Sequence, residues 1–247
     1  MAAADRLPDG VVLVRAPNPS PLTLDGTNTY LVDGWVVDPG PDDPGHLDAV
    51  ERAAGAGIEG IVITHDHPDH TAGAPELARR VGVQVSRPGG GRVGPFEVIA
   101  TPGHSADHVT LLRGRVAFTG DTVLGTGSVF ISPGEGSMAD YLESLARLRA
   151  VELDAICPGH GPVVWEPAAK LDAYVEHRLL REGRIVDALA RGARSEEELL
   201  EHVWSDVDLD GTPYLRVATG LTLKAHLQKL EAEGRLPPGF PPELVES

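Results

Sequence analysis

Three histidines and two aspartates lie within seven residues of this chain, directly after a short apolar run. The apolar run is residues 61–63 (IVI), and the polar stretch is residues 64–70 (THDHPDH). In an ordinary core, each such polar group left unpaired would cost about 1–3 kcal/mol. Imidazole and carboxylate are, however, the ligands that divalent metals such as zinc prefer. The stretch therefore predicts half of a metal site at the end of a buried strand.

Three further motifs complete a candidate ligand set, and each follows a predicted strand. His104 ends the TPGH motif, Asp121 lies in TGDT, and His160 lies in PGHG. Side chains at strand ends collect at one rim of a sheet, where functional sites on such scaffolds usually form. We therefore expect these residues to join the first stretch.

Apolar runs alternate with Gly-, Pro- and Asp-rich turns over the first two thirds of the chain, and the pattern is mostly helical from about residue 166. Strands are predicted at 11–14, 29–32, 35–37, 61–63, 83–85, 96–99, 109–112, 116–118 and 155–157. Helices are predicted at 46–56, 74–81, 138–149, 168–191 and 213–233, with a capping box from Ser195 to Glu198. The fold class is α/β (α+β), with a catalytic domain at 1–172 and a helical or winged-helix-like module at 173–247.

Composition limits the remaining function classes. The chain has 247 residues, a formal charge of −16 and a single cysteine, Cys157. The negative field repels phosphate backbones and counts against broad nucleic-acid binding. The sequence shows no window of the roughly 18 apolar residues that a membrane span needs, and its first residues carry no apolar signal core. We therefore expect a cytoplasmic protein without an internal disulfide.

The motifs together resemble the metallo-β-lactamase superfamily, whose His-x-His-x-Asp-His signature matches residues 65–70. The resemblance implies an αββα sandwich, two β-sheets face to face with helices outside. It also implies two zinc ions with a bridging hydroxide, although iron or manganese would suit the same ligands. By resemblance, the first metal takes His65, His67 and His104, the second takes Asp69, His70 and His160, and Asp121 bridges the two.

A narrower resemblance covers nearly the whole chain. Residues 18–32, 101–108 and 120–125 are similar to motifs of the β-lactamase-like protein 2 group, and the helical tail resembles that group's winged-helix-like tail. The group includes an endoribonuclease and many uncharacterised hydrolases, and glyoxalase II is a relative. Residues 131–137 depart from the group's pattern, so the substrate does not carry over.

Several residues have predicted roles beside the ligand set. Asp69 is the candidate catalytic residue, because a carboxylate there could both orient the hydroxide and pass its proton to the leaving group. Asp38, after the strand at 35–37, is the candidate acceptor for the outer N–H of a metal-binding histidine. His108 is expected to hold the 101–108 turn by hydrogen bonding, with a substrate contact as the alternative. Packing or surface roles are expected for His46, His177, His202 and His226.

The leading functional hypothesis is a dinuclear zinc hydrolase acting on a small ester, thioester or lactone-type substrate. The alternative is a metal-dependent endoribonuclease acting on single-stranded RNA, which would need a local positive groove of Arg178, Arg181, Arg184 and Lys224. Iron-based redox chemistry and a winged-helix regulator are weaker hypotheses. From residue 168 onward, ten Lys and Arg stand against fifteen Asp and Glu, which disfavours nucleic acid as a partner. A homodimer is kept as an alternative to a monomer.

Overall fold

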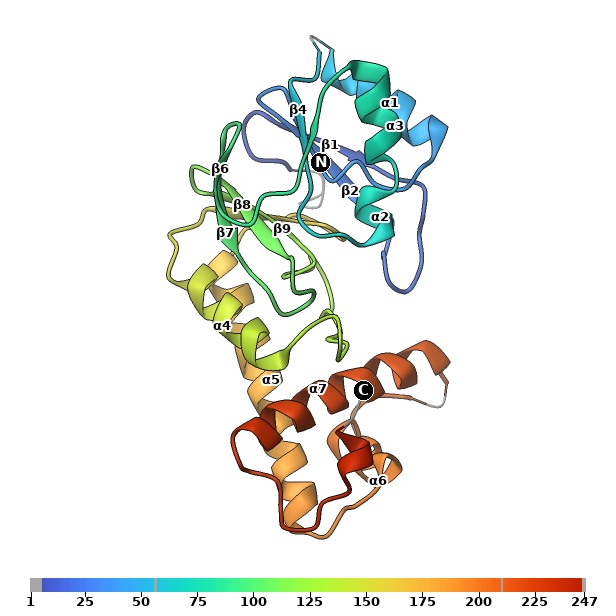
Figure 1. Cartoon of the computed structure of the whole chain (residues 1–247), viewed down its shortest axis with the longest axis vertical. Helices are drawn as coiled ribbons and strands as arrows, with labels where there is room; N and C mark the ends of the chain where they lie inside the picture. Colours follow the sequence, from blue (N-terminus) through green and yellow to red (C-terminus); the bar gives the residue numbers. More distant parts are fainter. Residues whose placement is uncertain (1–5, 56, 210, 246–247) are drawn as a thin grey trace. The chain divides into compact units, whose positions relative to one another are not determined.

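The computed structural model describes residues 6–55, 57–209 and 211–245, and Figure 1 traces their secondary structure. The chain forms two compact units. The first unit comprises Met1–Thr101, Asp107–Val129 and Arg149–Lys170, and the second comprises Pro102–Ala106, Phe130–Leu148 and Leu171–Ser247.

Two five-stranded mixed sheets form the first unit. The first sheet has the order β1-β2-β3-β4-β5, with its last two pairs, β3–β4 and β4–β5, parallel. Its strands are β1 (Val11–Arg15), β2 (Asn28–Val32), β3 (Trp35–Val37), β4 (Gly60–Val62) and β5 (Val85–Ser86). The second sheet has the order β10-β9-β8-β7-β6, with only the β9–β10 pair parallel. Its strands are β6 (Gly91–Val93), β7 (Phe96–Ala100), β8 (Val109–Arg113), β9 (Val116–Gly120) and β10 (Ala155–Pro158).

The two sheets pack face to face through a shared apolar core. Tyr30 of the first sheet meets Phe118 of the second edge to face, with ring centroids 5.3 Å apart, and Phe96 contacts Phe118 at 5.7 Å. Aromatic pairs in this geometry stabilise beyond the area they bury, by about 0.5–1.5 kcal/mol each. Val11 and Leu13 of β1, and Phe96 and Val98 of β7, alternate along their strands and belong to the same core.

Helices α1 (Pro44–Ala54) and α3 (Ala74–Val81) cover the outer face of the first sheet. Leu47, Val50 and Leu77 are fully buried there against Val36 and Ile61. Asp43 caps α1, because its side chain accepts a hydrogen bond from the backbone N–H of His46 at 2.7 Å. These helices follow the 3.6-residue apolar spacing that predicted them.

The predicted elements of the first unit are confirmed, with small differences at their ends. The strand expected at 83–85 is displaced to Val85–Ser86, since Val83 follows the helix cap at Gly82. Two short elements were not predicted: β6 and the single-turn helix α2 (Pro68–Thr71). The α2 turn is too short for a periodic pattern, yet it carries Asp69 and His70 of the histidine stretch.

The second unit is helical in its long C-terminal segment. The helices of the second unit are α4 (Met138–Arg149), α5 (Pro167–Ala190), α6 (Glu196–Val203) and α7 (Pro213–Ala232), and a 3₁₀ helix, η2 (Pro242–Leu244), follows α7. The last residue of α4 and the first residues of α5 fall within the ranges of the first unit. Leu199, Leu200, Leu223, Leu227 and Leu230 share one apolar core. The predicted capping box from Ser195 to Glu198 is present at the start of α6.

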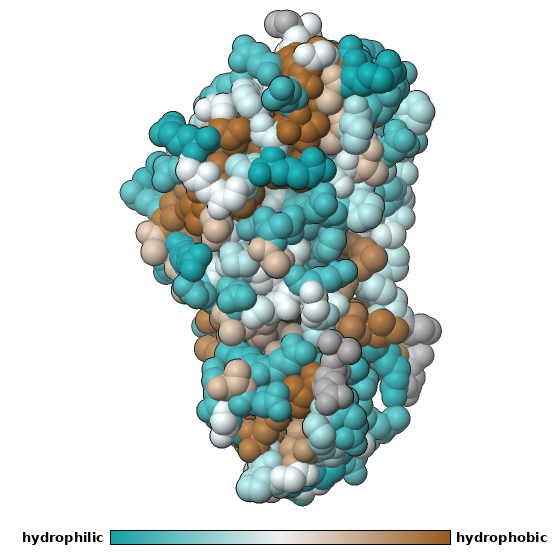
Figure 2. Space-filling model, viewed as in Figure 1, coloured by the Kyte–Doolittle hydropathy of each residue, from teal (hydrophilic) through white to brown (hydrophobic). Residues whose placement is uncertain are grey.

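The C-terminal segment is a helical module and shows no wing. Within residues 171–209 and 211–245 the structure contains helices but no β-strand. The boundary predicted between residues 172 and 173 falls inside α5 and stays a prediction. Among the described residues, no helix is both long and apolar enough to cross a bilayer. Figure 2 shows a face on which hydrophilic residues predominate, with apolar patches between them.

The buried carboxylate of Glu182 should make the second unit sensitive to acid. His226 (3.6 Å), Lys229 (2.9 Å) and Arg235 (2.6 Å) surround it and outweigh its burial, lowering its pKa to about 2. An unfolded glutamate titrates near about 4.3. The stabilisation is therefore present above about pH 4.3 and is lost as the pH falls towards about 2.

Urea unfolding of a Glu182→Gln variant checks this expectation. The difference in free energy of unfolding from wild type should be largest at pH 7 and should shrink steadily below about pH 4.3. Glu201→Gln, an exposed change on α6, is the matched control and should show little difference at either pH. A Glu182→Gln difference that stays constant down to pH 2 would contradict the prediction.

Candidate metal centre

The ends of two parallel strand pairs bring the predicted ligands together. In the first sheet, Val37 of β3 pairs with Val62 of β4, so Asp38 lies beside the residues that lead to His65. In the second sheet, Pro158 of β10 pairs with Gly120 of β9, so His160 lies beside Asp121. Parallel neighbours end at the same edge of a sheet, which explains why motifs far apart in sequence meet here.

Asp38 holds two parts of the histidine stretch at once. Its Oδ1 accepts a hydrogen bond from the backbone N–H of Thr64 at 2.8 Å. Its Oδ2 accepts from the Thr64 hydroxyl at 2.7 Å and from Nδ1 of His70 at 2.9 Å. Asp38 is 2% exposed and has a φ of +50°, a left-handed conformation that aspartate tolerates better than most residues. The predicted contact between Asp38 and a candidate ligand is thus present in the structure.

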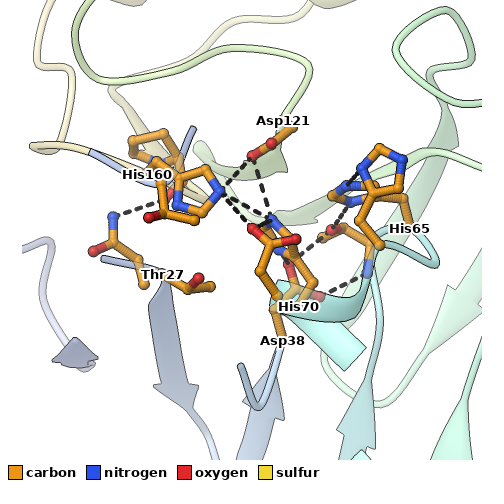
Figure 3. A network of polar contacts seen from close by, with 12 residues as sticks. Thr27, Asp38, His65, His70, Asp121 and His160 are labelled. Carbon is orange, nitrogen blue, oxygen red and sulfur yellow. Dashed lines mark hydrogen bonds and ion pairs between the residues drawn. The ribbon is translucent and has the colours of Figure 1, made fainter. Parts of the chain in front are cut away.

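His70, His160 and Asp121 point towards one another, as Figure 3 shows, and Asp69 joins them. Nε2 of His70 lies 3.2 Å from Nε2 of His160. Oδ2 of Asp69 lies 3.1 Å from Nε2 of His160 and 3.5 Å from Nε2 of His70. Oδ1 of Asp121 lies 3.4 Å from each of these two nitrogens. The ligand atoms of Asp69, His70 and His160 all lie within 4.8 Å of one another.

The outer hydrogen bonds of His70 and His160 fix the tautomers of both rings. Nδ1 of His70 donates to Asp38, and Nδ1 of His160 donates to the carbonyl oxygen of Gly26 at 3.4 Å. Each Nε2 then carries a lone pair when the ring is neutral. Two lone pairs and two carboxylates facing one point repel one another unless a cation lies between them. The donor chemistry of this cluster therefore fits a divalent metal ion.

His65 and His67 form a second pair beside this cluster. The Thr64 hydroxyl gives its only hydrogen to Asp38, so its oxygen accepts from Nδ1 of His65 at 3.1 Å. That contact leaves Nε2 of His65 with its lone pair, and it lies 3.0 Å from Nδ1 of His67. Ligand atoms of His65, His70 and Asp121 also lie within 4.8 Å of one another. The first unit thus offers two overlapping groups of metal-binding side chains.

The clustered charges shift the pKa values of their own members. Burial lowers the pKa of His160, but Asp121 and Asp69 outweigh it and raise that pKa to about 9. Burial likewise lowers the pKa of His70, which Asp121 and Asp38 raise well above its usual value. Burial raises the pKa of Asp121, yet His160 and His70 hold it well below the normal range. The cluster therefore attracts positive charge at neutral pH, and a metal ion competes there with protons.

Two glycines let the backbone come close to these side chains. A Cβ on Gly120, whose φ is +43°, would lie 2.4 Å from Oγ1 of Thr64. A Cβ on Gly159 would lie 2.6 Å from Cε1 of His70 and 2.7 Å from Oδ1 of Asp121. A side chain at Gly120 would collide with Thr64 and His108, whereas one at Gly159 would enter the space between His70 and Asp121.

His104 belongs to the second unit, on the segment Pro102–Ala106. It is buried, and its Nδ1 donates to the carbonyl oxygen of Phe130 at 3.3 Å. That contact leaves Nε2 as the ring nitrogen with the lone pair, as in His65, His70 and His160. The role of His104 as a metal ligand remains a prediction.

Some supporting residues escaped prediction because their partners are distant in sequence. The side chain of Asn28 donates to the carbonyl oxygens of Pro158 and Gly161, at 3.0 and 2.8 Å, and so holds the turn that carries His160. The Thr29 hydroxyl donates a hydrogen bond to the backbone carbonyl oxygen of Asp38 at 2.7 Å. Of these supporting residues, only Thr64 could have been identified from the local sequence, because it directly precedes His65 at a strand end.

Comparisons with known proteins agree with this geometry. A sequence model of the Metallo-beta-lactamase superfamily matches residues 22–88 and 84–160. The Beta-lactamase-like protein 2 homolog of Caenorhabditis elegans is 31% identical, over 93% of this chain and 87% of its own length. An atrochrysone carboxyl ACP thioesterase of Aspergillus chevalieri is 29% identical, over 83% of this chain and 76% of that protein.

A solved structure adds a metal-bound relative. TTHA1623 in a di-iron-bound form is 26% identical, with a TM-score of 0.53, and the match covers 64% of this chain and 96% of that chain. The match therefore supports a shared fold over about two thirds of this chain. It leaves the identity of the metal in this chain undecided.

Proposed function

Because this chain belongs to the metallo-beta-lactamase superfamily, we propose that its metal-dependent hydrolase site holds two zinc ions and cleaves a small ester, thioester or lactone. The observation that carries the proposal is the set of facing donors. Nε2 of His70 and Nε2 of His160 lie 3.2 Å apart, with carboxylates of Asp69 and Asp121 within 3.5 Å. Such a set can bind a divalent cation in place of the protons that its histidines would otherwise hold.

The proposed ligand sets are those that the family resemblance implies. One ion would take His65, His67 and His104, the other Asp69, His70 and His160, with Asp121 between them. When bound, a pair of divalent ions supplies a water activated near neutral pH and polarises the oxygen of the substrate's reacting group. Zinc suits mixed imidazole and carboxylate ligands, whereas the di-iron-bound form of TTHA1623 keeps iron as the alternative.

The chain's own residues supply orientation and proton handling. Asp38 and the Gly26 carbonyl oxygen hold the rings of His70 and His160 with Nε2 inward. Asp69 is half-buried, with a side chain 30% exposed, so it can contact both the metal and a solvent-accessible substrate. Burial raises the pKa of Asp69, but His160 and His70 outweigh it and keep the group ionised. An ionised carboxylate there can accept a proton and return it to a leaving group.

The substrate class follows from charge and from one relative. The charge of −16 and the acidic tail do not attract a polyanion. The Aspergillus chevalieri relative carries the name thioesterase, and thioesters are among the small acyl substrates that an activated water can cleave. A small acyl compound therefore fits this chain better than a polymeric phosphodiester does.

A panel of ester, thioester, lactone and β-lactam substrates tests the proposal. Zinc-loaded protein should turn over at least one of the first three classes, and a His67→Ala variant should not. Elemental analysis of the purified protein should find two zinc ions per chain. No turnover beyond that of the variant would reject the substrate class, and a single iron per chain would reject the metal assignment.

The surroundings of three of the four residues expected in a positive groove disfavour the ribonuclease alternative. Arg178 and Arg181 of the expected positive groove are 3% and 5% exposed. Arg181 and Arg184 both pair with Asp206, at 2.6 and 2.9 Å. These side chains are therefore engaged inside the second unit. Cleavage of single-stranded RNA that is abolished in an Asp69→Ala variant would reverse this conclusion.

A further inference from the structure

We propose that His108 is a positioning residue of the metal centre, which holds the backbone of Asp121 through Nε2 and supports the ring of His65 by stacking. The inference rests on the proposed metal site, and it assigns His108 a task beyond holding its own turn. His108 is 1% exposed and precedes β8 at the same sheet edge as the ligands.

The hydrogen bond to Asp121 is the first part of the argument. The backbone N–H of Asp121 donates to Nε2 of His108 at 3.1 Å. Since this backbone group is a donor, Nε2 must be the acceptor, and the proton of a neutral ring must lie on Nδ1. Nδ1 has matching oxygens, Oγ1 of Thr122 at 3.1 Å and Oγ1 of Thr101 at 3.3 Å. The surroundings thus select one tautomer, and that tautomer is the one that can hold Asp121.

The close approach of the backbone is the second part. A Cβ on Gly120 would lie only 2.9 Å from Nε2 of His108, so the strand end carrying Asp121 lies directly against this ring. Asp121 is the residue whose Oδ1 lies 3.4 Å from both His70 and His160. Fixing its backbone N–H restricts where its carboxylate can point.

Stacking on His65 is the third part. The rings of His108 and His65 lie 4.6 Å apart between centroids, with their planes at 24°. The backbone N–H of Val109 also donates to the carbonyl oxygen of Thr64 at 2.8 Å, which ties the residue after His108 to the residue before His65. One side chain therefore contacts a candidate ligand of each sheet, His65 on the first and Asp121 on the second.

Two variants separate the two nitrogens of His108. Glutamine places its amide near the position of Nε2, so His108→Gln keeps an acceptor for Asp121. Asparagine places its amide near the position of Nδ1, so His108→Asn keeps only the donor to Thr122 and Thr101. Both are neutral polar amides, and each serves as the control for the other.

The measurements are metal affinity by chelator competition, the visible absorption of the cobalt-substituted protein, and the melting temperature of the metal-free protein. We expect His108→Asn to lose about 10–100-fold in metal affinity and to change the cobalt spectrum. His108→Gln should keep the wild-type spectrum and most of the affinity. The melting temperatures of the two metal-free variants should agree with each other.

The outcomes distinguish this inference from the proposed function. Wild-type protein that binds no divalent metal would reject the metal site itself. Wild-type protein that binds metal, with both variants equally impaired or both unimpaired, would reject the role of His108 alone. If His108→Asn does not fold, His108→Gln decides by itself, because a changed cobalt spectrum in that variant would overturn the proposal.

Discussion

An Asp69→Asn variant should fold normally and lose catalysis by about 100- to 10,000-fold, the range expected when a positioned proton-transfer group is removed. The amide keeps the size of the side chain but can neither take up a proton nor supply negative charge to a metal. Oδ2 of Asp69 lies 3.1 Å from Nε2 of His160, so the second metal should also bind more weakly. Turnover of the substrate found by the panel, together with metal content after dialysis, measures both effects.

The same stretch supplies a matched control. Asp66→Asn makes the same chemical change three residues earlier, where the side chain is 65% exposed and pairs only at the surface with Arg87 at 3.2 Å. This variant should keep wild-type activity and metal content, since exposed ion pairs contribute little. Equal losses in the two variants would show that Asp69 has no special role.

Replacing Asp38 with alanine should be the most destabilising single change at the site. The substitution removes the acceptor of three buried donors, two on Thr64 and one on His70. Each unpaired buried donor costs about 1–3 kcal/mol, so we expect a loss of at least ~3 kcal/mol in the free energy of unfolding. Metal affinity should fall by about 10–100-fold, because the His70 ring loses the group that orients it. Urea unfolding of the metal-free protein and chelator competition check the two parts.

Asp33→Ala controls for backbone strain in this experiment. Asp33 has a φ of +48°, close to the +50° of Asp38, so alanine meets the same left-handed conformation at both positions. Its side chain, however, is 44% exposed and pairs with Arg113 at the surface. Asp33→Ala should therefore cost about 1 kcal/mol of strain and at most about 1 kcal/mol for the exposed ion pair. A similar loss in both variants would mean that the Asp38 hydrogen bonds contribute nothing measurable.

Local patterns were sufficient to predict most elements of the fold. The helix at 138–149 was predicted with the observed bounds, because its apolar stripe and polar flanks lie within one continuous segment. The strand at 83–85 was displaced, since a short apolar run after a helix has no local signal that sets its register. The wing of the predicted winged helix does not appear in the described C-terminal residues, where local apolar spacing indicated helices alone.

The sequence by itself determined which residues can bind a metal. Their types and their places after apolar strands were readable without a structure, from His65 to His160. Only the tertiary structure decided which nitrogen of His70 and of His160 faces inward. Those choices depend on partners remote in the chain, such as Gly26 for His160 and Asp38 for His70, which lie 134 and 32 residues away. The physical reason is that a histidine's tautomer follows its hydrogen-bond partner, and here the folded sheets, not the local sequence, supply that partner.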